Sequence, residues 1–402
     1  DKSYGEYLTM SKIEYLVDFW DPEKGSGEEA LTLHRYSDAQ AVTMIDALYE
    51  QQYKVILAVN AILEYVDLRQ AIFDPGAYEA VKGECLALRA MCHLDILRLF
   101  GPVPAEATSV PILPYVETVT KELHRHVNFD GYKARLIADL ENAEGLLKQH
   151  LEKQSEIEED YFKYRTIRMN YYAVKALMAR VYLWAGQTPK AGNIANELIA
   201  HPLLGTNRIL FRLYSDKIPT MSDDYFTANS ENNSQLSLSQ NQRKEFYETE
   251  KYESSDKRIP SWLILNPNTI ESDANTGRYF VSKYNQNGPM NQGIPLLRMT
   301  EIQYICAECQ AEPAKGLDYL NTVRHEYGIP AAFDLTKENC VFEEELFKEY
   351  RKSFLAEGQL FFFLKRKDYT DIPGALNIEN PRKIFCFPLP DDEKEFGNLI
   401  TK

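Results

Sequence analysis

The chain has 402 residues, and 45 basic against 60 acidic side chains give it a formal net charge of −15 and a pI near 5.1. This excess of negative charge argues against a nucleic-acid partner, because phosphate recognition needs a basic surface, and it favours neutral or cationic ligands. The apolar stretches are far shorter than the ~20 residues needed to span a bilayer, so no transmembrane helix is expected.

Helical periodicity dominates the sequence. Apolar residues recur at spacings of three and four over 83–100, and this run ends at Gly101-Pro102. A second amphipathic run covers 129–148. We expect these two helices to pair as an antiparallel hairpin over a long connection.

Two further segments have the size of tetratricopeptide hairpins. Residues 169–186 carry two apolar stripes, which places this helix and its Trp184 inside the core. This helix and a second helix near 191–198 are expected to form a hairpin of about 34 residues. A similar pair covers 298–311 and 314–327. The pattern predicts a mainly α fold in which tetratricopeptide-like helical hairpins form a short superhelix.

We find no composition shift that divides the chain, so a single domain over 1–402 is expected. Its helical frame covers approximately 38–200 and 296–366, and an extended C-terminal segment covers approximately 367–402. Between the two parts of the frame, 202–295 lacks periodicity but is rich in aromatic residues, which argues for order. We interpret this insertion as a packed, loop-rich, ligand-binding region.

The sequence indicates neither a cofactor nor a metal site. Cys306 and Cys309 form a CxxC pair, but no second pair accompanies it, so these are expected to be small buried residues. His124 and His126 alternate without an identifiable third ligand, and a solvated turn is the simpler interpretation.

Catalytic motifs for nucleotide, serine-hydrolase or zinc-protease chemistry are absent from the sequence. Asp223-Asp224 is the most suggestive carboxylate pair, because glycoside hydrolysis uses two carboxyl groups across a sugar. Adjacent side chains seldom point the same way, however. We therefore expect no enzymatic activity, and we keep an all-α carbohydrate-active enzyme as an alternative.

Aromatic residues are abundant, with 26 Tyr, 19 Phe and 3 Trp. A pyranose stacks its C–H face on a ring while its hydroxyl groups need polar partners. Two places combine rings with such partners: one near Trp20, the other near Trp262. The candidate ligand-binding residues are Trp20, Arg35, Tyr36, Trp262, Arg278, Tyr279 and Tyr284. The alternative is that these rings only pack loops onto the helices.

A series of motifs covers most of the chain. In order they are Tyr53-x-x-Ile56 with Asn60, Leu97–Pro104, Ala176–Leu183, Leu320–Arg324, Glu357–Phe362 and Phe387–Pro390. The series resembles the SusD/RagB family of nutrient-binding outer-membrane lipoproteins of the Bacteroidota. Leu360 and Phe363 stand where the family usually has Arg and Asp, so packing is expected to replace an ion pair there.

The resemblance implies a non-catalytic, cell-surface glycan-binding protein. Its ligand would be an oligosaccharide or polysaccharide, and its partner a SusC-type TonB-dependent outer-membrane transporter, with the helical face on the transporter and the loop face on the glycan. Members are held at the outer membrane by a lipidated cysteine, which here would lie upstream of Asp1. No binding residue of the family carries over, so the candidate residues rest on composition and position alone.

Two other readings stay open. Capture of a peptide or glycoprotein nutrient by the same type of complex agrees with the acidic charge, which would steer cationic peptides. A helical-repeat scaffold that binds only proteins would show no sugar binding. Within the frame, Arg89, Asp95 and Arg98 are expected to form a partly buried ion network.

Overall fold

The computed structural model describes residues 2–17, 20, 22–106, 108–153, 165–202, 204–206, 208–226, 236–252, 255–266, 277–370 and 381–397. Its α-helices are α1 (Gly27–Thr32), α2 (Ala39–Val66), α3 (Ala77–Phe100), α4 (Phe129–Lys153), α6 (Tyr171–Trp184), α7 (Thr188–Ile199), α8 (Ile218–Phe226), α9 (Gln240–Tyr247), α10 (Thr249–Tyr252), α11 (Arg258–Trp262), α12 (Met299–Glu308), α13 (Pro313–Glu326), α14 (Phe342–Ser353), α15 (Gln359–Arg366) and α16 (Asp391–Phe396). The shorter helical turns are η1 (Glu6–Met10), η2 (Lys12–Val17), η3 (Asp67–Ile72), η4 (Pro104–Glu106), η5 (Ala331–Phe333) and η6 (Pro381–Phe385). In the part of the chain that is described, no helix is both long and apolar enough to cross a membrane.

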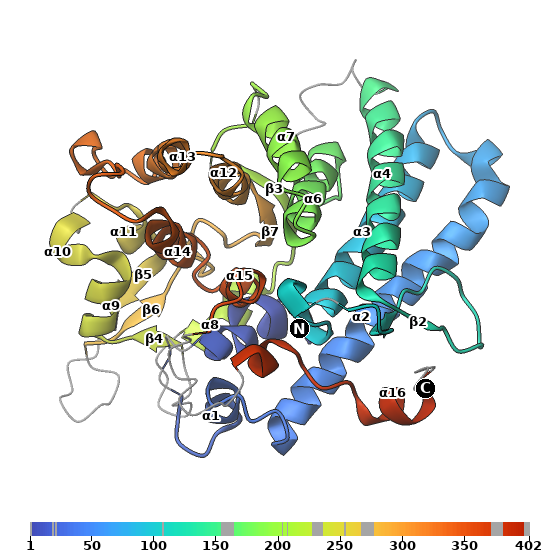
Figure 1. Cartoon of the computed structure of the whole chain (residues 1–402), viewed down its shortest axis with the longest axis horizontal. Helices are drawn as coiled ribbons and strands as arrows, with labels where there is room; N and C mark the ends of the chain where they lie inside the picture. The colour runs from blue at the N-terminus through green and yellow to red at the C-terminus, as the bar shows by residue number, and fades with distance from the viewer. Residues whose placement is uncertain are drawn as a thin grey trace.

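The three long helices α2, α3 and α4 pack side by side at one end of the molecule (Figure 1). The predicted pairing of α3 with α4 is confirmed, and a glycine allows their close approach. A Cβ at Gly83 would stand 2.8 Å from Cγ of Leu147 and 3.3 Å from the carbonyl oxygen of Ala143. Helix α3 ends at Phe100, and its C-cap residue Gly101 is followed by Pro102, which cannot continue a helix.

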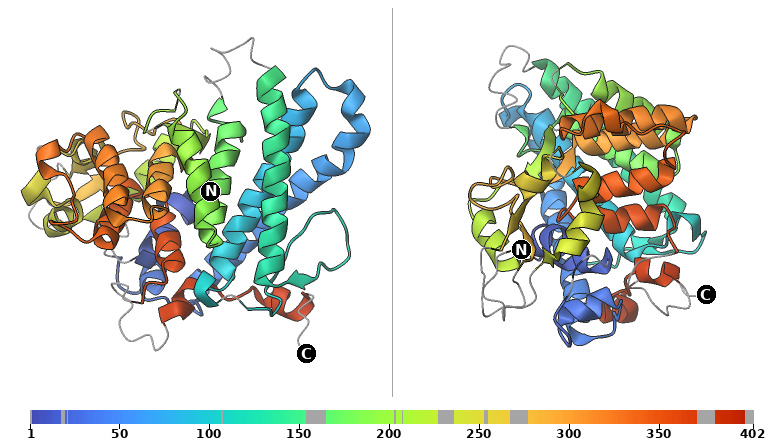
Figure 2. Two further views of the ribbon diagram at one scale, coloured as in Figure 1. Left: turned by 45° about the horizontal axis from the view of Figure 1, so that its top comes forward. Right: turned by 90° about the vertical axis from the view of Figure 1, so that its left-hand side faces the viewer.

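The tetratricopeptide-like hairpins are also confirmed, as α6 with α7 and α12 with α13 (Figure 2). The side chain of Asn170 caps α6 by accepting the backbone N–H groups of Tyr172 and Ala173, at 3.0 and 3.1 Å. Helix α7 packs against α12, which joins the two hairpins into one superhelical layer. Trp184 is only 4% exposed, so its predicted place in the core is correct.

The region 202–295 is more regular than the sequence indicated. Strand β3 (Ile209–Leu213) pairs antiparallel with β7 (Ile294–Arg298). A small antiparallel sheet has the order β4–β6–β5, formed by Ser237–Leu238, Tyr279–Val281 and Leu263–Leu265. Helices α8 to α11 lie between these strands in sequence. Short strands evade a search for helical periodicity, because two or three residues show no repeat. A further two-stranded pair, β1 (Leu113–Pro114) with β2 (His126–Val127), lies in the connection between α3 and α4.

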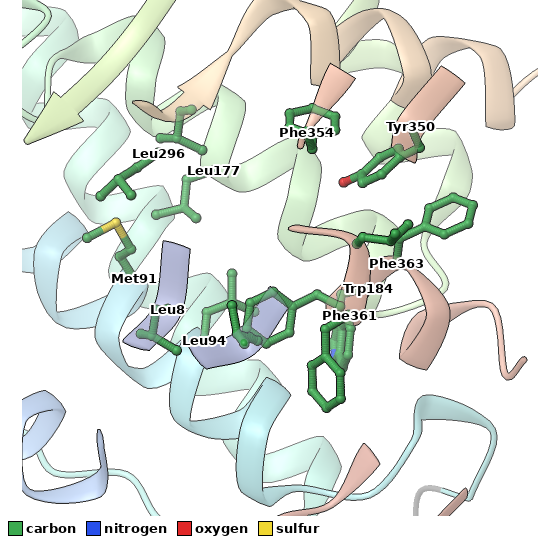
Figure 3. Close-up of a cluster of buried hydrophobic side chains, with 14 of the residues drawn as sticks. Leu8, Met91, Leu94, Leu177, Trp184, Leu296, Tyr350, Phe354, Phe361 and Phe363 are labelled. Carbon is green, nitrogen blue, oxygen red and sulfur yellow. The ribbon is translucent and has the colours of Figure 1, made fainter. Parts of the chain in front are cut away.

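The N-terminal segment is part of the core. Figure 3 shows Leu8 among side chains of α3, α6 and α15. Gly358, just before α15, has φ +68°, and a Cβ there would stand 2.0 Å from the carbonyl oxygen of Leu8, so only glycine fits. Leu360 and Phe363 are buried, and the ring centroid of Phe363 lies 4.5 Å from that of Tyr350, in agreement with packing in place of an ion pair.

Arg89 and Arg98 belong to two separate ion pairs, which corrects the expected network of Arg89, Asp95 and Arg98. Arg89 of α3 donates to both carboxylate oxygens of Asp139 on α4, at 2.7 and 2.5 Å. Arg98 pairs instead with Asp95 one turn earlier on its own helix. The first pair links two helices, and the second lies within one helix. The expectation was wrong because residue spacing on one helix does not identify an ion-pair partner on another helix.

Candidate ligand-binding groove along helix α2

Three of the predicted ligand-binding residues lie in the core. Trp20, Trp262 and Tyr284 are 3%, 5% and 0% exposed. The Trp262 ring is packed by the ammonium group of Lys283, 4.5 Å from its centroid, and by Tyr327 at 5.5 Å. A pyranose needs an open ring face, so the structure assigns these three rings to packing, which was the alternative interpretation.

Arg278 and Tyr279 lie at the start of strand β6 and are partly exposed. Arg278 donates through Nε to Oγ of Ser237 at 2.6 Å and through Nη2 to the carbonyl oxygen of Ser237 at 2.9 Å. The Tyr279 ring lies 4.3 Å from the guanidinium of Arg243. These contacts join β6 to β4 and α9, and the role of Arg278 and Tyr279 in ligand binding stays a prediction.

The first predicted cluster is divided between core and surface. Arg35 is exposed and pairs with Asp38 at 3.2 Å, whereas Trp20 is buried. The Tyr36 hydroxyl donates to the carbonyl oxygen of Ile384 at 2.5 Å, and its ring meets that of Phe387 edge-on at 5.0 Å. Tyr36 is therefore fixed against the C-terminal segment, at the edge of a hollow.

That hollow has a volume of about 350 Å³ and lies between the first turns of α2 and the C-terminal segment. Its polar groups come from Ser37, Asp46, Asp391 and Lys394. The remaining lining is Tyr36, Val42, Ile45 and Pro388–Pro390. Aromatic and apolar walls with a few polar groups are typical of small-ligand sites.

A second hollow of about 400 Å³ follows along the same helix. Tyr49 and Tyr53, one helical turn apart, form its wall, with ring centroids 4.7 Å from each other. The Tyr53 hydroxyl donates to the carbonyl oxygen of Pro114 at 3.0 Å. Tyr49 is 8% exposed, and burial raises the pKa of its hydroxyl, as do the neighbouring Tyr53 and Glu393 side chains.

Helix α16 contributes to both hollows, through Asp391 and Lys394 on one side and Glu393 on the other. Its position is fixed at two points. The backbone N–H of Phe387 donates to the carbonyl oxygen of Leu99 at 2.9 Å, and Nε2 of His126 lies 2.6 Å from Oε1 of Glu393. We call the two hollows with α16 between them the α2 groove. Figure 1 shows the positions of α2 and α16.

The α2 groove is long and acidic. From Val42 to Leu57 the helix rises by roughly 22 Å. The lining carries five carboxylates against two ammonium groups: Asp46, Glu50, Glu122, Asp391 and Glu393 against Lys54 and Lys394. Burial raises the pKa of Asp46, and the nearby negative charges of Asp391 and Asp392 raise it further.

The sequence contains one pattern that indicates this groove. Tyr49 and Tyr53 stand at i and i+4 on a helix, which places both rings on one face. The motif that contains Tyr53 and Ile56 indicates a frame helix and does not by itself indicate a ligand site. Glu393 comes from a segment far away in sequence, and no local pattern indicates that it would meet α2.

A further hollow of about 400 Å³ lies where α4, α6, α7 and α15 end or begin. Its arginine, Arg366, is already bound by both carboxylate oxygens of Glu308, at 2.7 and 2.8 Å. Trp184 lines it but is buried, so it offers no ring face to a sugar. The α2 groove, with its tyrosines, is the better candidate.

The other residues that could be reactive or bind a metal ion are either part of the packed structure or exposed at the surface. Burial raises the pKa of the thiols of Cys306 and Cys309 to about 12 and about 11, which leaves them protonated and unreactive near neutral pH. Asp223 and Asp224 are exposed neighbours on α8. Within the described residues no cluster of His, Cys, Asp or Glu is arranged to hold a metal ion.

Family models match two long segments of the chain. Residues 10–183 match the model described as "Starch-binding associating with outer membrane", and residues 220–372 match the model described as "SusD family". A comparison with curated protein sequences gives no significant match.

Solved structures share the fold over nearly the whole length. A SusD superfamily protein from Bacteroides thetaiotaomicron is 18% identical, with a TM-score of 0.73 over 98% of this chain and 94% of its own. Surface glycan-binding protein A from Bacteroides uniformis is 14% identical, with a TM-score of 0.72 over 97% and 92%. The same-named protein from B. thetaiotaomicron, solved with laminarihexaose, is 14% identical, with a TM-score of 0.68 over 97% and 92%.

The two family models follow each other in the order of the motif series, and the helical hairpins that the series implied are present. The chain belongs to the SusD/RagB family.

Proposed function

We propose that this protein is a non-catalytic cell-surface receptor that captures an oligosaccharide or polysaccharide in the α2 groove. The observation that carries the proposal is the pair of hollows lined by Tyr36, Tyr49 and Tyr53, each of which also has carboxylates in its lining. Membership of the family and the laminarihexaose complex of a structural neighbour support a glycan as the ligand.

The groove has the chemistry that a sugar chain needs. The partly exposed rings of Tyr36 and Tyr53 and the apolar side chains present surface for the C–H faces of pyranose units, while carboxylates accept hydrogen bonds from hydroxyl groups. Two hollows separated by α16 would hold two parts of one chain.

Delivery is the second part of the proposal. By resemblance to its family the protein would be anchored at the outer membrane through a lipidated cysteine and would pass its ligand to a SusC-type TonB-dependent transporter. The description of the first matched family model, with its association with the outer membrane, supports this location.

Affinity electrophoresis of the purified protein in gels that contain single polysaccharides tests the proposal. We expect at least one polysaccharide to retard the migration of the protein. The chain length of that polysaccharide should stay unchanged after incubation with the protein. The variant Tyr36→Ala combined with Tyr49→Phe should migrate freely, whereas the exposed-surface variant Tyr214→Ala should be retarded like the parent. Shortening of the polymer would favour an enzyme, and loss of this turnover in Asp223→Asn would identify its carboxylate.

Capture of a peptide is the second candidate. The observation in its favour is that apolar residues and carboxylates dominate the groove, which suits a basic and apolar segment. Calorimetry with a lysine-rich amphipathic peptide separates the two candidates. Peptide binding with no retardation by any polysaccharide would replace the glycan proposal.

A further inference from the structure

The charges of the α2 groove restrict the class of glycan, and this inference rests on the proposed function. Each of its two ammonium groups already has an acidic partner on its own helix. Lys54 pairs with Glu50 at 2.7 Å, and Lys394 pairs with Asp391 at 2.9 Å. Both cations are thereby neutralised locally, and the remaining carboxylates set the potential inside the groove.

Three of these carboxylates face the two hollows from different elements. Asp46 comes from α2, Glu122 from the connection between α3 and α4, and Glu393 from α16. Asp392 adds a fourth negative charge next to Asp46 and contributes to its raised pKa. Carboxylates thus face the groove from α2, from α16 and from the connection between α3 and α4.

Apart from the basic side chains of the lining itself, two further cations lie close to Glu122 in sequence. Lys121 and Arg125 are exposed on the same connection as Glu122. Within the lining, His124 and the paired Lys54 and Lys394 are the only basic side chains among the described residues. A bound anion would therefore meet unpaired carboxylates before it met an unpaired cation.

We infer that the α2 groove takes neutral glycans or glycans with protonated amino groups and rejects polymers of uronic acids or sulfated sugars. A polyanion would place several negative charges within one Debye length, about 8 to 10 Å, of the carboxylates. A protonated amino sugar would instead be attracted to the carboxylates. Hydroxyl groups of a neutral sugar donate to the carboxylates without this charge term.

A panel of three polymers tests the inference at low and high salt. Laminarin is neutral, chitosan carries amino groups and polygalacturonate carries carboxylates. At about 50 mM salt we expect polygalacturonate to bind at least ~10-fold more weakly than laminarin and chitosan to bind more tightly. At about 500 mM salt the spread between charged and neutral polymers should shrink, because salt screens exposed charges.

A charge-matched pair of variants separates groove charge from total charge. The groove variant is Asp46→Asn, Glu50→Gln and Glu122→Gln; the control variant is Asp318→Asn, Glu326→Gln and Glu338→Gln. All six side chains are exposed, so neither variant should unfold. The groove variant should bind polygalacturonate at least several-fold more tightly than the parent, and the control variant should not.

Each outcome distinguishes the inference from the proposed function. Equal binding of laminarin and polygalacturonate by the parent would overturn the inference and leave glycan capture intact. An equal gain of polygalacturonate binding in both variants would also overturn it, because net charge would then be the cause. If none of the polymers binds at either salt concentration, the proposed function fails as well.

Discussion

His126 and Glu393 stand 267 positions apart in sequence, and Nε2 of the first lies 2.6 Å from Oε1 of the second. The His126 side chain is fully buried, while that of Glu393 is 20% exposed and borders the larger hollow. This contact ties α16 to β2 and so sets the spacing between the C-terminal segment and α2. The groove exists because the last described helix is held in this position.

Glu393→Gln should weaken that contact. A neutral amide makes a weaker hydrogen bond than a carboxylate, and we expect a loss of about 1 kcal/mol in the free energy of unfolding. Urea denaturation measures the loss, and calorimetry with a retained glycan should show weaker binding. Glu395→Gln, an exposed change on the same helix, is the control and should alter neither. Unchanged glycan binding in Glu393→Gln would contradict this role for α16.

Tyr49→Phe and Tyr53→Phe remove one hydroxyl each from the same wall. The Tyr53 hydroxyl bonds to Pro114, so its removal should cost about 1 kcal/mol of stability. The Tyr49 hydroxyl lies beside Glu393 in the lining of the same hollow, so Tyr49→Phe should reduce glycan affinity. Urea denaturation and calorimetry on the two variants check this division. Unchanged glycan affinity in Tyr49→Phe would exclude its hydroxyl from the ligand site.

Trp262→Ala distinguishes packing from ligand contact. The side chain is buried against Lys283 and Tyr327, so the cavity left behind should lower the free energy of unfolding by about 3 to 5 kcal/mol. Tyr279→Ala, on the partly exposed start of β6, should cost much less. Thermal denaturation compares the two. A stable Trp262→Ala variant with reduced glycan affinity would restore Trp262 to the ligand site.

Glu14 should make stability depend on pH. Burial raises its pKa to about 7, against an ordinary value near 4.5, although the backbone N–H of Gly358 donates to it at 2.8 Å. Between these values the folded state holds the proton more tightly than the unfolded state. The contribution of Glu14 is therefore fully present below about pH 4.5 and is lost as the pH rises to about 7.

Glu14→Gln removes this titration. Relative to the parent, the variant should gain up to about 3 kcal/mol between pH 4.5 and pH 8, the equivalent of the shift in pKa. Denaturation of both proteins at the two pH values gives the difference, in which the other titrating groups cancel. The same stability difference at both pH values would show that Glu14 does not titrate in this window.

The helical frame was predictable because its elements are long and periodic. The pairing of α3 with α4 and the two tetratricopeptide-like hairpins follow from apolar spacing over ten or more residues. The small sheet β4–β6–β5 was not found, because its strands have two or three residues each. The ion pairs were misassigned for a similar reason: the partner of Arg89 is on another helix.

The ligand site was less accessible to sequence reasoning. The sequence pattern of a ring next to polar residues is the same whether the ring faces solvent or the core. Trp20, Trp262 and Tyr284 are buried in the structure. Tyr36 was identified and does border a hollow. The rest of the groove depends on contacts between α2 and the C-terminal segment, which only the folded chain brings together.

The central claim, that a glycan occupies the α2 groove, is tested most directly by hydrogen exchange of the protein with and without a retained polysaccharide. Backbone amides of residues 36–57 and 387–397 should exchange more slowly when the glycan is bound, because ligand binding suppresses local opening of both walls. Slower exchange confined to residues 277–284, at the start of β6, would contradict the claim and would place the ligand beside Arg278 and Tyr279.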